Sequence, residues 1–162
     1  KQTIEEVLTQ EFAVNDYPAF KACLHGAREI LFIGDNAGES VFDRILIEEL
    51  QKPVQYAVRG TPVINDVTFE DAVQAGIDEV ATIISSGTDA PGAILGTCSP
   101  EFRAVYGRSS LIISKGQGNY EALSTERGPL FFLVKAKCGV IAEDMGVEDG
   151  DIVLKQAQKA MG

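Results

Sequence analysis

Short apolar runs alternate along the chain with segments in which apolar residues recur every three or four positions. The short runs have the length, and the content of Ile, Val and Phe, that are typical of buried strands. They are "REILFIG" (28–34), "VQYAV" (54–58), "EVATIIS" (79–85), "SLIIS" (110–114) and "LFFLV" (130–134), and a short last strand is predicted in "VEDGDIVL" (147–154). "LFFLV" is expected to be a central strand within the core.

The segments with helical spacing are predicted to be helices, and several carry start or stop signals. They are residues 3–12, 15–27, 39–52, 68–76 and 99–107. Asn15 or Asp16 is the expected cap of the second helix and Gly26 its stop. Thr68 with Asp71 predicts a capping box, and Ser99 precedes Pro100 at a first helical position. In residues 39–52 the apolar positions at helical spacing are Val41, Phe42, Ile45, Leu46 and Leu50.

Strands that alternate with helices predict an α/β fold with a parallel sheet and helices on both faces. The expected architecture is a three-layer α/β/α sandwich with a mostly parallel, Rossmann-like sheet. A length of 162 residues favours one domain, so residues 1–162 are expected to form a single unit.

Composition and charge exclude several classes of function. The formal net charge of −10 argues against a nucleic-acid partner, because phosphate backbones are bound by clustered Lys and Arg. The sequence has no apolar run near the roughly 20 residues that span a bilayer, so no membrane partner is expected. Three cysteines without CxxC spacing favour a reduced, cytoplasmic compartment. No feature of the sequence predicts an oligomeric state.

The single histidine, His25, restricts the chemistry that the chain can perform. It lies near the predicted end of a helix, where a structural or surface role is expected. Without a second histidine a Ser-His-Asp triad has no other candidate base, and a zinc site lacks suitably spaced ligands.

Ligands of parallel α/β sheets bind beyond the carboxyl ends of the strands. The loops at these positions are rich in glycine and polar residues: "GDNAGE", "RGTPVINDVT", "SGTDAPG" and "SKGQGNYE". A dinucleotide loop requires G-x-G-x-x-G, but Asn36 stands at the second glycine, and Asp35 and Glu39 add negative charge. NAD(P) or S-adenosylmethionine binding is therefore disfavoured, and the sequence contains no P-loop motif.

Binding of a divalent metal ion fits the first loop better. Asp35 and Asn36 supply hard oxygen ligands of the kind that Mg²⁺ or Mn²⁺ prefers. A second carboxylate is expected from the neighbouring loop, where Asp66 is the candidate. The alternative is helix capping, because Asp and Asn before helices usually accept hydrogen bonds from free backbone N–H groups.

Other residues of these loops are candidates for contacting a phosphate group. Lys115 supplies a cation at a strand end, and Arg59 is suited to bidentate pairing with phosphate. Glycine loops expose backbone N–H groups to anions. The remaining predicted substrate-binding positions are Gly87 and Thr88 in the third loop and Gly116 and Asn119 in the fourth.

The four loops together resemble the prokaryotic branch of the damage-control metal-dependent phosphatases, long catalogued as a domain of unknown function. The resemblance runs from about residue 27 to 150 and includes "IGDNAGE", "VRGTPVINDVT", "ISKGQGNYE" and "KAKCGVIA". It implies that Asp35, Asn36 and Asp66 bind a divalent metal and that Lys115 contacts the phosphate. It also implies that the chain is the C-terminal, Rossmann-like part of a longer protein.

The expected function is hydrolysis of phosphomonoesters of small, damaged or surplus metabolites with Mg²⁺, Mn²⁺, Co²⁺ or Ni²⁺. The nucleophile is left open between water activated by the metal and a carboxylate of Asp35 or Asp66. Glu39 is expected to act in general acid–base chemistry or to support the metal ligands; its alternative is an ordinary first-turn helix acid. Two other functions remain: a nucleotide- or S-adenosylmethionine-binding Rossmann-like enzyme and a non-catalytic regulatory domain.

Overall fold

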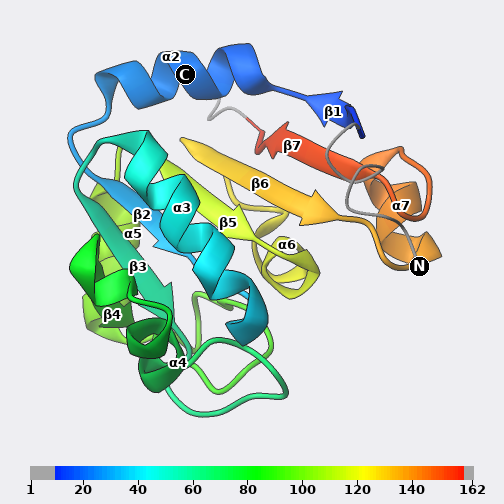
Figure 1. Ribbon diagram of the computed structural model, residues 1–162. Coiled ribbons are helices and arrows are strands. Elements are labelled where there is room, and N and C mark those ends of the chain that lie inside the picture. Colours follow the sequence, from blue (N-terminus) through cyan, green and yellow to red (C-terminus); the bar gives the residue numbers. More distant parts are fainter. Residues whose placement is uncertain (1–9, 159–162) are drawn as a thin grey trace.

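The computed structural model describes residues 10–158 of the chain as one alternating series of strands and helices (Figure 1). In order, the elements are β1 (Phe12–Asn15), α2 (Tyr17–Gly26), β2 (Ile30–Ile33), η1 (Ala37–Glu39), α3 (Ser40–Leu50), β3 (Val54–Val58), α4 (Phe69–Gln74), η2 (Ile77–Glu79), β4 (Thr82–Ser85), α5 (Pro100–Arg108), β5 (Ile112–Lys115), α6 (Gln117–Leu123), β6 (Leu130–Lys135), α7 (Gly139–Met145) and β7 (Ile152–Gln156). The six predicted strands are all present as β2 to β7.

The strands form a seven-stranded sheet in the order β1-β7-β6-β5-β2-β3-β4. All neighbours are parallel except β6 and β7, which pair antiparallel. β3 and β4 follow on one side of β2. β5, β6 and β7 then follow on the other side of β2. This reversal of strand order is the feature of doubly wound folds at which a ligand crevice opens. The predicted mostly parallel, Rossmann-like sheet is confirmed.

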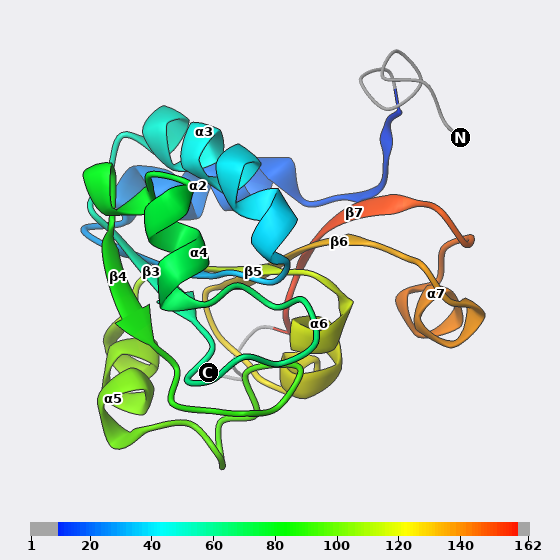
Figure 2. The same cartoon turned by 60° about the horizontal axis from the view of Figure 1, so that its bottom comes forward.

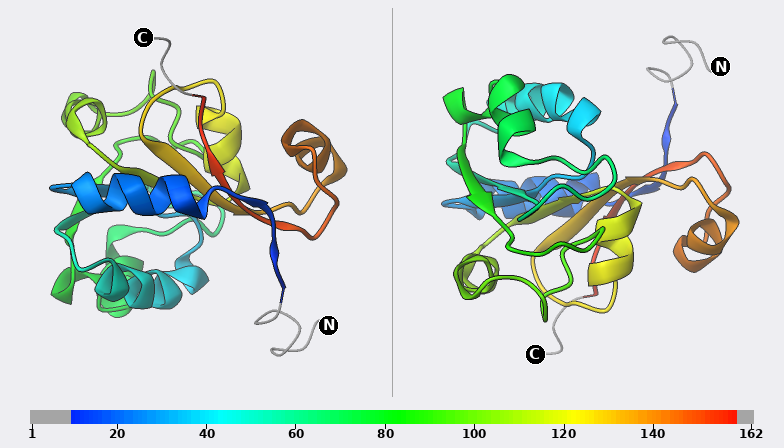
Figure 3. Two further views of the ribbon diagram at one scale, coloured as in Figure 1. Left: turned by 90° about the horizontal axis from the view of Figure 1, so that it is seen from above. Right: turned by 90° about the horizontal axis from the view of Figure 1, so that it is seen from below.

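Alternate residues of the strands pack into two separate cores, one on each face of the sheet. Ile30 and Phe32 lie in the core beneath α2, α3 and α4, whereas Leu31 and Ile33 lie in the core beneath α5, α6 and α7. Figure 2 shows α2, α3 and α4 above the sheet and α5 and α6 below it, and Figure 3 shows the same separation seen along the sheet. A strand buried on both faces needs a continuous apolar run, which explains the composition of β2 and β6.

The predicted caps of two helices are confirmed. The Thr68 side chain accepts the Asp71 N–H and the Asp71 side chain accepts the Thr68 N–H, which completes the capping box of α4. The Ser99 hydroxyl accepts the Phe102 N–H at the start of α5. At α2, Asp16 has the cap position, but its carboxylate accepts the Gln156 N–H of β7 instead.

Three expectations about local structure differ from the fold. The helix predicted for residues 3–12 falls mainly outside the described residues, and Phe12 opens β1 instead. Helices α6 and α7 were not predicted. Both are only seven residues long and have glycine at or near their first residue, which is not typical of a helix. The buried residues of α3 are Ser40, Asp43, Ile47 and Leu50, while Val41, Phe42 and Ile45 are exposed.

The remaining sequence expectations concern thiols and membranes. Cys23, Cys98 and Cys138 are free thiols. Within the described residues, none of the helices combines the length and apolar character that crossing a membrane requires.

Candidate active site

The candidate site lies at the carboxyl ends of β2 and β5, on the two sides of the reversal in strand order. Gly34 and Asp35 follow β2, and Lys115 is the last residue of β5. The two strands are parallel neighbours in which Ile33 pairs with Ser114, so Asp35 and Gly116 emerge side by side. Gly116 has φ +80°, and a Cβ there would overlap the Asp35 carboxylate. Only glycine therefore allows the aspartate to lie across this strand end.

Backbone pairing brings the Asp35-Asn36 loop against the loop that contains Asp66. The Ala37 N–H donates to the Asn65 carbonyl at 2.9 Å, and the Val67 N–H donates to the Asp35 carbonyl at 2.7 Å. Asn36 and Asp66 thereby form an antiparallel bridge. The three residues that the sequence predicts as metal ligands are brought together, although Asp66 lies 30 positions after Asn36 in the chain.

Helix capping, the alternative to metal binding, accounts for Asn36 but not for Asp66. The Asn36 Oδ1 accepts the Gly38 N–H at 2.7 Å and caps η1, which leaves its second lone pair for another partner. Asp66 is not a cap, because Thr68 caps α4. The Asp66 Oδ2 instead accepts the Arg59 Nε–H at 2.6 Å. Among the described residues, no hydrogen bond to the Asp35 carboxylate is present.

The electrostatic environment opposes ionisation of Asp35. Burial, followed by the neighbouring carboxylates Asp66 and Glu39, raises the pKa of Asp35, whereas Arg59 and Lys115 lower it; the net result is a pKa of about 6. Four carboxylates gather here, those of Asp35, Glu39, Asp43 and Asp66, and Arg59 and Lys115 form ion pairs with the last three of them. A divalent cation between Asp35 and Asp66 would offset this excess of negative charge.

The chemistry of the donors suits a hard cation that keeps solvent or substrate oxygens as further ligands. In residues 10–158 no group of three or more His, Cys, Asp or Glu side chains has a metal-binding arrangement. A cation at this site would have two carboxylates and the Asn36 amide oxygen as protein ligands. Mg²⁺ and similar ions are commonly held by one or two carboxylates together with water and phosphate oxygens.

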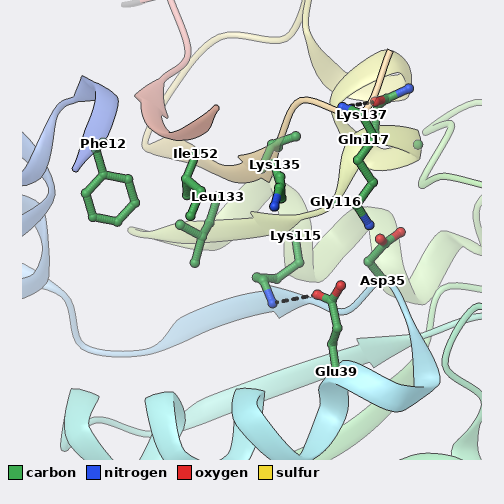
Figure 4. A pocket seen from close by; sticks show the side chains of 12 residues that line it. Phe12, Asp35, Glu39, Lys115, Gly116, Gln117, Leu133, Lys135, Lys137 and Ile152 are labelled. Carbon is green, nitrogen blue, oxygen red and sulfur yellow. Dashed lines mark hydrogen bonds and ion pairs between the residues drawn. The ribbon is translucent and has the colours of Figure 1, made fainter. Parts of the chain in front are cut away.

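Lys115 is held by two acidic side chains of the η1–α3 segment. Its Nζ donates to Asp43 Oδ1 at 2.8 Å and to Glu39 Oε2 at 3.2 Å, and Figure 4 shows the contact with Glu39. Burial lowers the pKa of Lys115, but these two carboxylates outweigh burial and the net shift is upward. The ammonium group therefore stays charged at the edge of the crevice.

Asp43 and Tyr56 are site residues that the sequence analysis did not single out. Asp43 is 1% exposed and its Oδ2 accepts the Tyr56 hydroxyl at 2.8 Å. Burial raises the pKa of Asp43, whereas the ion pair with Lys115 lowers it. The available signal was the spacing of Glu39 and Asp43, which places both acids on one side of the helix.

Arg59 is completely buried beneath the crevice. Its Nε donates to Asp66 and its Nη2 donates to Asn119 Oδ1 at 3.1 Å, whereas Nη1 has no partner among the described residues. An arginine in this position fixes the orientation of Asp66 by a charged hydrogen bond. The structure therefore places Arg59 behind a predicted metal ligand rather than on the open surface of the crevice.

Asn119 joins the ends of the strands around the crevice. Its Nδ2 donates to the carbonyl oxygens of Gly34 (3.0 Å) and Lys115 (2.8 Å). Its Oδ1 accepts from Arg59 Nη2 and from the Ala93 N–H (2.9 Å). The side chain is fully buried with its hydrogen-bonding capacity used, so it lies beneath the surface that a substrate would contact.

Gly87 and Thr88 of the third predicted loop lie further away, after β4, although Gly92 at the end of that loop packs against Gly118 of α6. The Gly60 N–H donates to the Thr88 carbonyl, and the Thr88 hydroxyl is 2.7 Å from the Thr97 hydroxyl. Gly87 has φ +74° and packs against Ser99. The cavity that contains Asp35, Glu39, Lys115 and Gly116 is not lined by Gly87 or Thr88.

Comparison with known proteins identifies the family. A model described as the damage-control phosphatase ARMT1-like domain matches residues 1–153. The chain belongs to this family. The family resemblance of the four loops is thus confirmed.

Two of three similar relatives are named damage-control phosphatases. A Methanocaldococcus jannaschii protein described as uncharacterized, MJ0202, is 46% identical over 134 residues, covering 78% of this chain and 44% of its own. Damage-control phosphatase PH1575 of Pyrococcus horikoshii is 37% identical over 158 residues (94% and 55%). A damage-control phosphatase of Archaeoglobus fulgidus is 37% identical over 147 residues (88% and 50%).

The fold of the family is also matched in a crystal structure. PH1575 of Pyrococcus horikoshii, described as a DUF89 family protein, superposes with a TM-score of 0.89 over 94% of this chain and 55% of its own. The chain thus spans about half the length of the relatives it matches.

Proposed function

We propose that this chain carries the metal- and phosphate-binding centre of a divalent-metal-dependent phosphatase that hydrolyses phosphomonoesters of small metabolites. The observation that carries the proposal is the closeness of Asp35 to Asp66, whose loop is bridged to Asn36, with the charge of Lys115 nearby and Arg59 bonded to Asp66. The names of the relatives from Pyrococcus horikoshii and Archaeoglobus fulgidus support the phosphatase class.

In this proposal Asp35, Asp66 and the Asn36 amide oxygen hold Mg²⁺, Mn²⁺, Co²⁺ or Ni²⁺. When bound, such an ion supplies positive charge to the phosphoryl oxygens in the transition state. Arg59 orients Asp66 through the hydrogen bond from its Nε–H, and Asn119 holds the strand ends at their spacing. The absence of a side chain at Gly116 leaves room for the Asp35 carboxylate at the end of β5.

Lys115 contributes the second cation of the proposed mechanism. Its ammonium group is held at the crevice by Asp43 and Glu39, so little conformational entropy is lost when a phosphate oxygen binds. With water as the nucleophile, its oxygen bonds to phosphorus as the ester P–O bond breaks, and the proton that the water loses passes to the leaving alkoxide. With a carboxylate as the nucleophile, the alkoxide takes its proton from solvent, and water then hydrolyses the acyl phosphate to release phosphate. If a carboxylate is the nucleophile, Asp35 is the better placed, because Asp66 Oδ2 is already bonded to Arg59.

Hydrolysis of an aryl phosphate by the whole protein tests the proposal. We expect turnover with Mg²⁺, Mn²⁺, Co²⁺ or Ni²⁺, loss of turnover with a chelator, and a fall of at least about 100-fold in kcat for Asp35→Ala, the range for loss of one electrostatic catalytic group. Asp149→Ala, an exposed aspartate in a distant turn, is the matched control. Turnover that survives the chelator, or full activity of Asp35→Ala, would contradict the assignment.

A further inference from the structure

A cavity of about 420 Å³ adjoins the candidate site and has two chemically different ends. One end is polar and charged, and it is lined by Asp35, Glu39, Lys115, Gln117 and Lys137. The other end is apolar, and it is lined by Leu133, Ile152 and Phe12. Figure 4 shows the two groups on opposite sides of the view, with Lys135 between them. The candidate metal and phosphate site lies at the polar end, so the apolar end is left for another part of a ligand.

The register of the sheet explains why the three apolar side chains lie next to each other. Lys115 of β5 pairs with Leu133 of β6, so the apolar end begins one strand away from the lysine. Two residues after Leu133, on the same face of β6, Lys135 pairs with Ile152 of β7. Ile152 in turn pairs with Phe12 of β1. The apolar end therefore continues over β6, β7 and β1, and the two steps between these strands make it about 10 Å wide.

The apolar side chains at this end are only partly covered by the rest of the protein. Leu133 and Ile152 are half-buried, and Phe12 is 39% exposed. Their chain neighbours on the opposite face of the sheet, Phe132 and Val153, lie in a core and are at most 2% exposed. Apolar surface that lines a cavity is removed from water on several sides when an apolar group of a ligand enters. The exposed area at this end therefore favours a hydrocarbon group in the cavity.

We propose that the substrate is a phosphate ester whose organic part ends in an apolar group, an alkyl chain or a ring, that binds Leu133, Ile152 and Phe12. The inference rests on the proposed phosphatase function, since it places the phosphate at the Asp35 and Lys115 end. A hydrocarbon group in this position removes apolar surface of both partners from water. A polyol would bring hydroxyl groups against three side chains without hydrogen-bonding atoms, and these hydroxyls would lose their bonds to water.

A series of n-alkyl phosphates from ethyl to hexyl tests the inference on the whole protein with Mg²⁺. We expect kcat/KM to rise with chain length by up to about fourfold for each methylene, the effect of burying one CH₂ group completely. Hexitol 1-phosphate, with the same number of carbons as hexyl phosphate, should be the poorer substrate of the two.

Variants of two partly exposed phenylalanines locate the effect. Phe12→Ala should flatten the series for the longer chains, mainly through KM, and should leave ethyl phosphate unchanged because a short chain does not reach β1. Phe69→Ala is the matched control, since Phe69 is 53% exposed on α4 and does not line the cavity. This variant should keep the wild-type dependence on chain length.

Binding of the corresponding n-alkylphosphonates separates failure of the inference from failure of the proposed function. Their Kd values, measured by calorimetry, do not depend on turnover. If none of the esters is hydrolysed, the phosphatase assignment is wrong, and a Kd that falls with chain length in the wild type but not in Phe12→Ala still supports the apolar subsite. Three results would overturn the subsite: Kd and kcat/KM that do not change with chain length, a preference for hexitol 1-phosphate, or a chain-length effect that Phe12→Ala leaves intact.

Discussion

Asp35 is the residue at which the negative charge of the crevice is least compensated. Burial of its carboxylate, together with the nearby charges of Asp66 and Glu39, raises its pKa to about 6. Asp66 differs because it is bonded to Arg59, and Asn36 differs because it is uncharged and caps η1. The three predicted metal ligands therefore differ in charge and in hydrogen-bond partners, although they lie close together.

The Asp35→Asn variant should be more stable than the wild type when metal is absent and the pH is high. A carboxyl whose pKa is higher in the folded than in the unfolded state binds its proton more tightly when folded. The free energy of unfolding therefore falls as the pH rises from 3.8 to about 6 through this group. We expect Tm of the variant to exceed that of the wild type by about 2–4 °C at pH 8, the shift that accompanies about 1 kcal/mol in a domain of this size.

Thermal unfolding with a chelator at pH 4 and pH 8 measures this effect. At pH 4 the wild-type carboxyl is largely protonated in the folded state, so the two proteins should have nearly equal Tm. Asp149→Asn removes an exposed carboxylate and should not reproduce the difference. A lower Tm for Asp35→Asn at pH 8 would show that the Asp35 charge is favourable in the metal-free fold.

At the scale of single elements, helix α3 shows how the site changes which residues of a helix are buried. The side of α3 that faces the sheet contains Ser40 and Asp43 next to Ile47 and Leu50, because Asp43 must reach Lys115 and Tyr56. The apolar Val41, Phe42 and Ile45 consequently face outward. The prediction of a helix from the spacing is therefore confirmed, but of the five apolar residues only Leu46 and Leu50 pack against the core.

Two isoleucines of α3 allow a matched test of this arrangement. Ile47 is 2% exposed and Ile45 is 57% exposed, and both lie in the interior of the same helix. We expect Ile47→Ala to lower the free energy of unfolding by about 2–5 kcal/mol, the usual result for a core Ile. Ile45→Ala should cost less than about 0.5 kcal/mol, as exposed substitutions do. Urea unfolding of both variants gives the comparison, and equal losses would mean that Ile45 is also packed.

At the scale of the whole molecule, the site depends on strands that are adjacent in space but distant in sequence. Asn119 illustrates this, since its four hydrogen bonds reach the ends of β2 and β5, the residue after β3 and the segment before α5. Loss of its side chain would leave buried donors and acceptors of several elements without partners.

The Asn119→Ala variant should therefore be destabilised and should lose activity together with stability. We expect the free energy of unfolding to fall by about 2–4 kcal/mol, since each unsatisfied buried group costs about 1–3 kcal/mol. Asn15→Ala is the control: this asparagine is exposed and makes one local bond, to the Tyr17 N–H. Denaturant unfolding measures both, and similar losses in the two variants would contradict a special role for Asn119.

Local sequence determined most of the secondary structure, because apolar runs, glycine and capping residues act over a few positions. The β2 to β7 strands, the Thr68 and Ser99 caps and the alternation that defines the α/β class all follow from such signals. The candidate residues Asp35, Asn36, Asp66 and Lys115 were also accessible, since ligands of this fold bind after strand ends.

Tertiary structure alone decided how these residues are arranged. The bridge between Asn36 and Asp66, the burial of Arg59 and the contact of Lys115 with Asp43 join segments separated by up to 72 positions. Spacing in a sequence carries no information about such pairs, because the order of strands in the sheet determines which loops meet. The reversal of strand order between β2 and β5 creates the crevice, and the pleat of β6 directs Leu133 and Lys135 into its cavity.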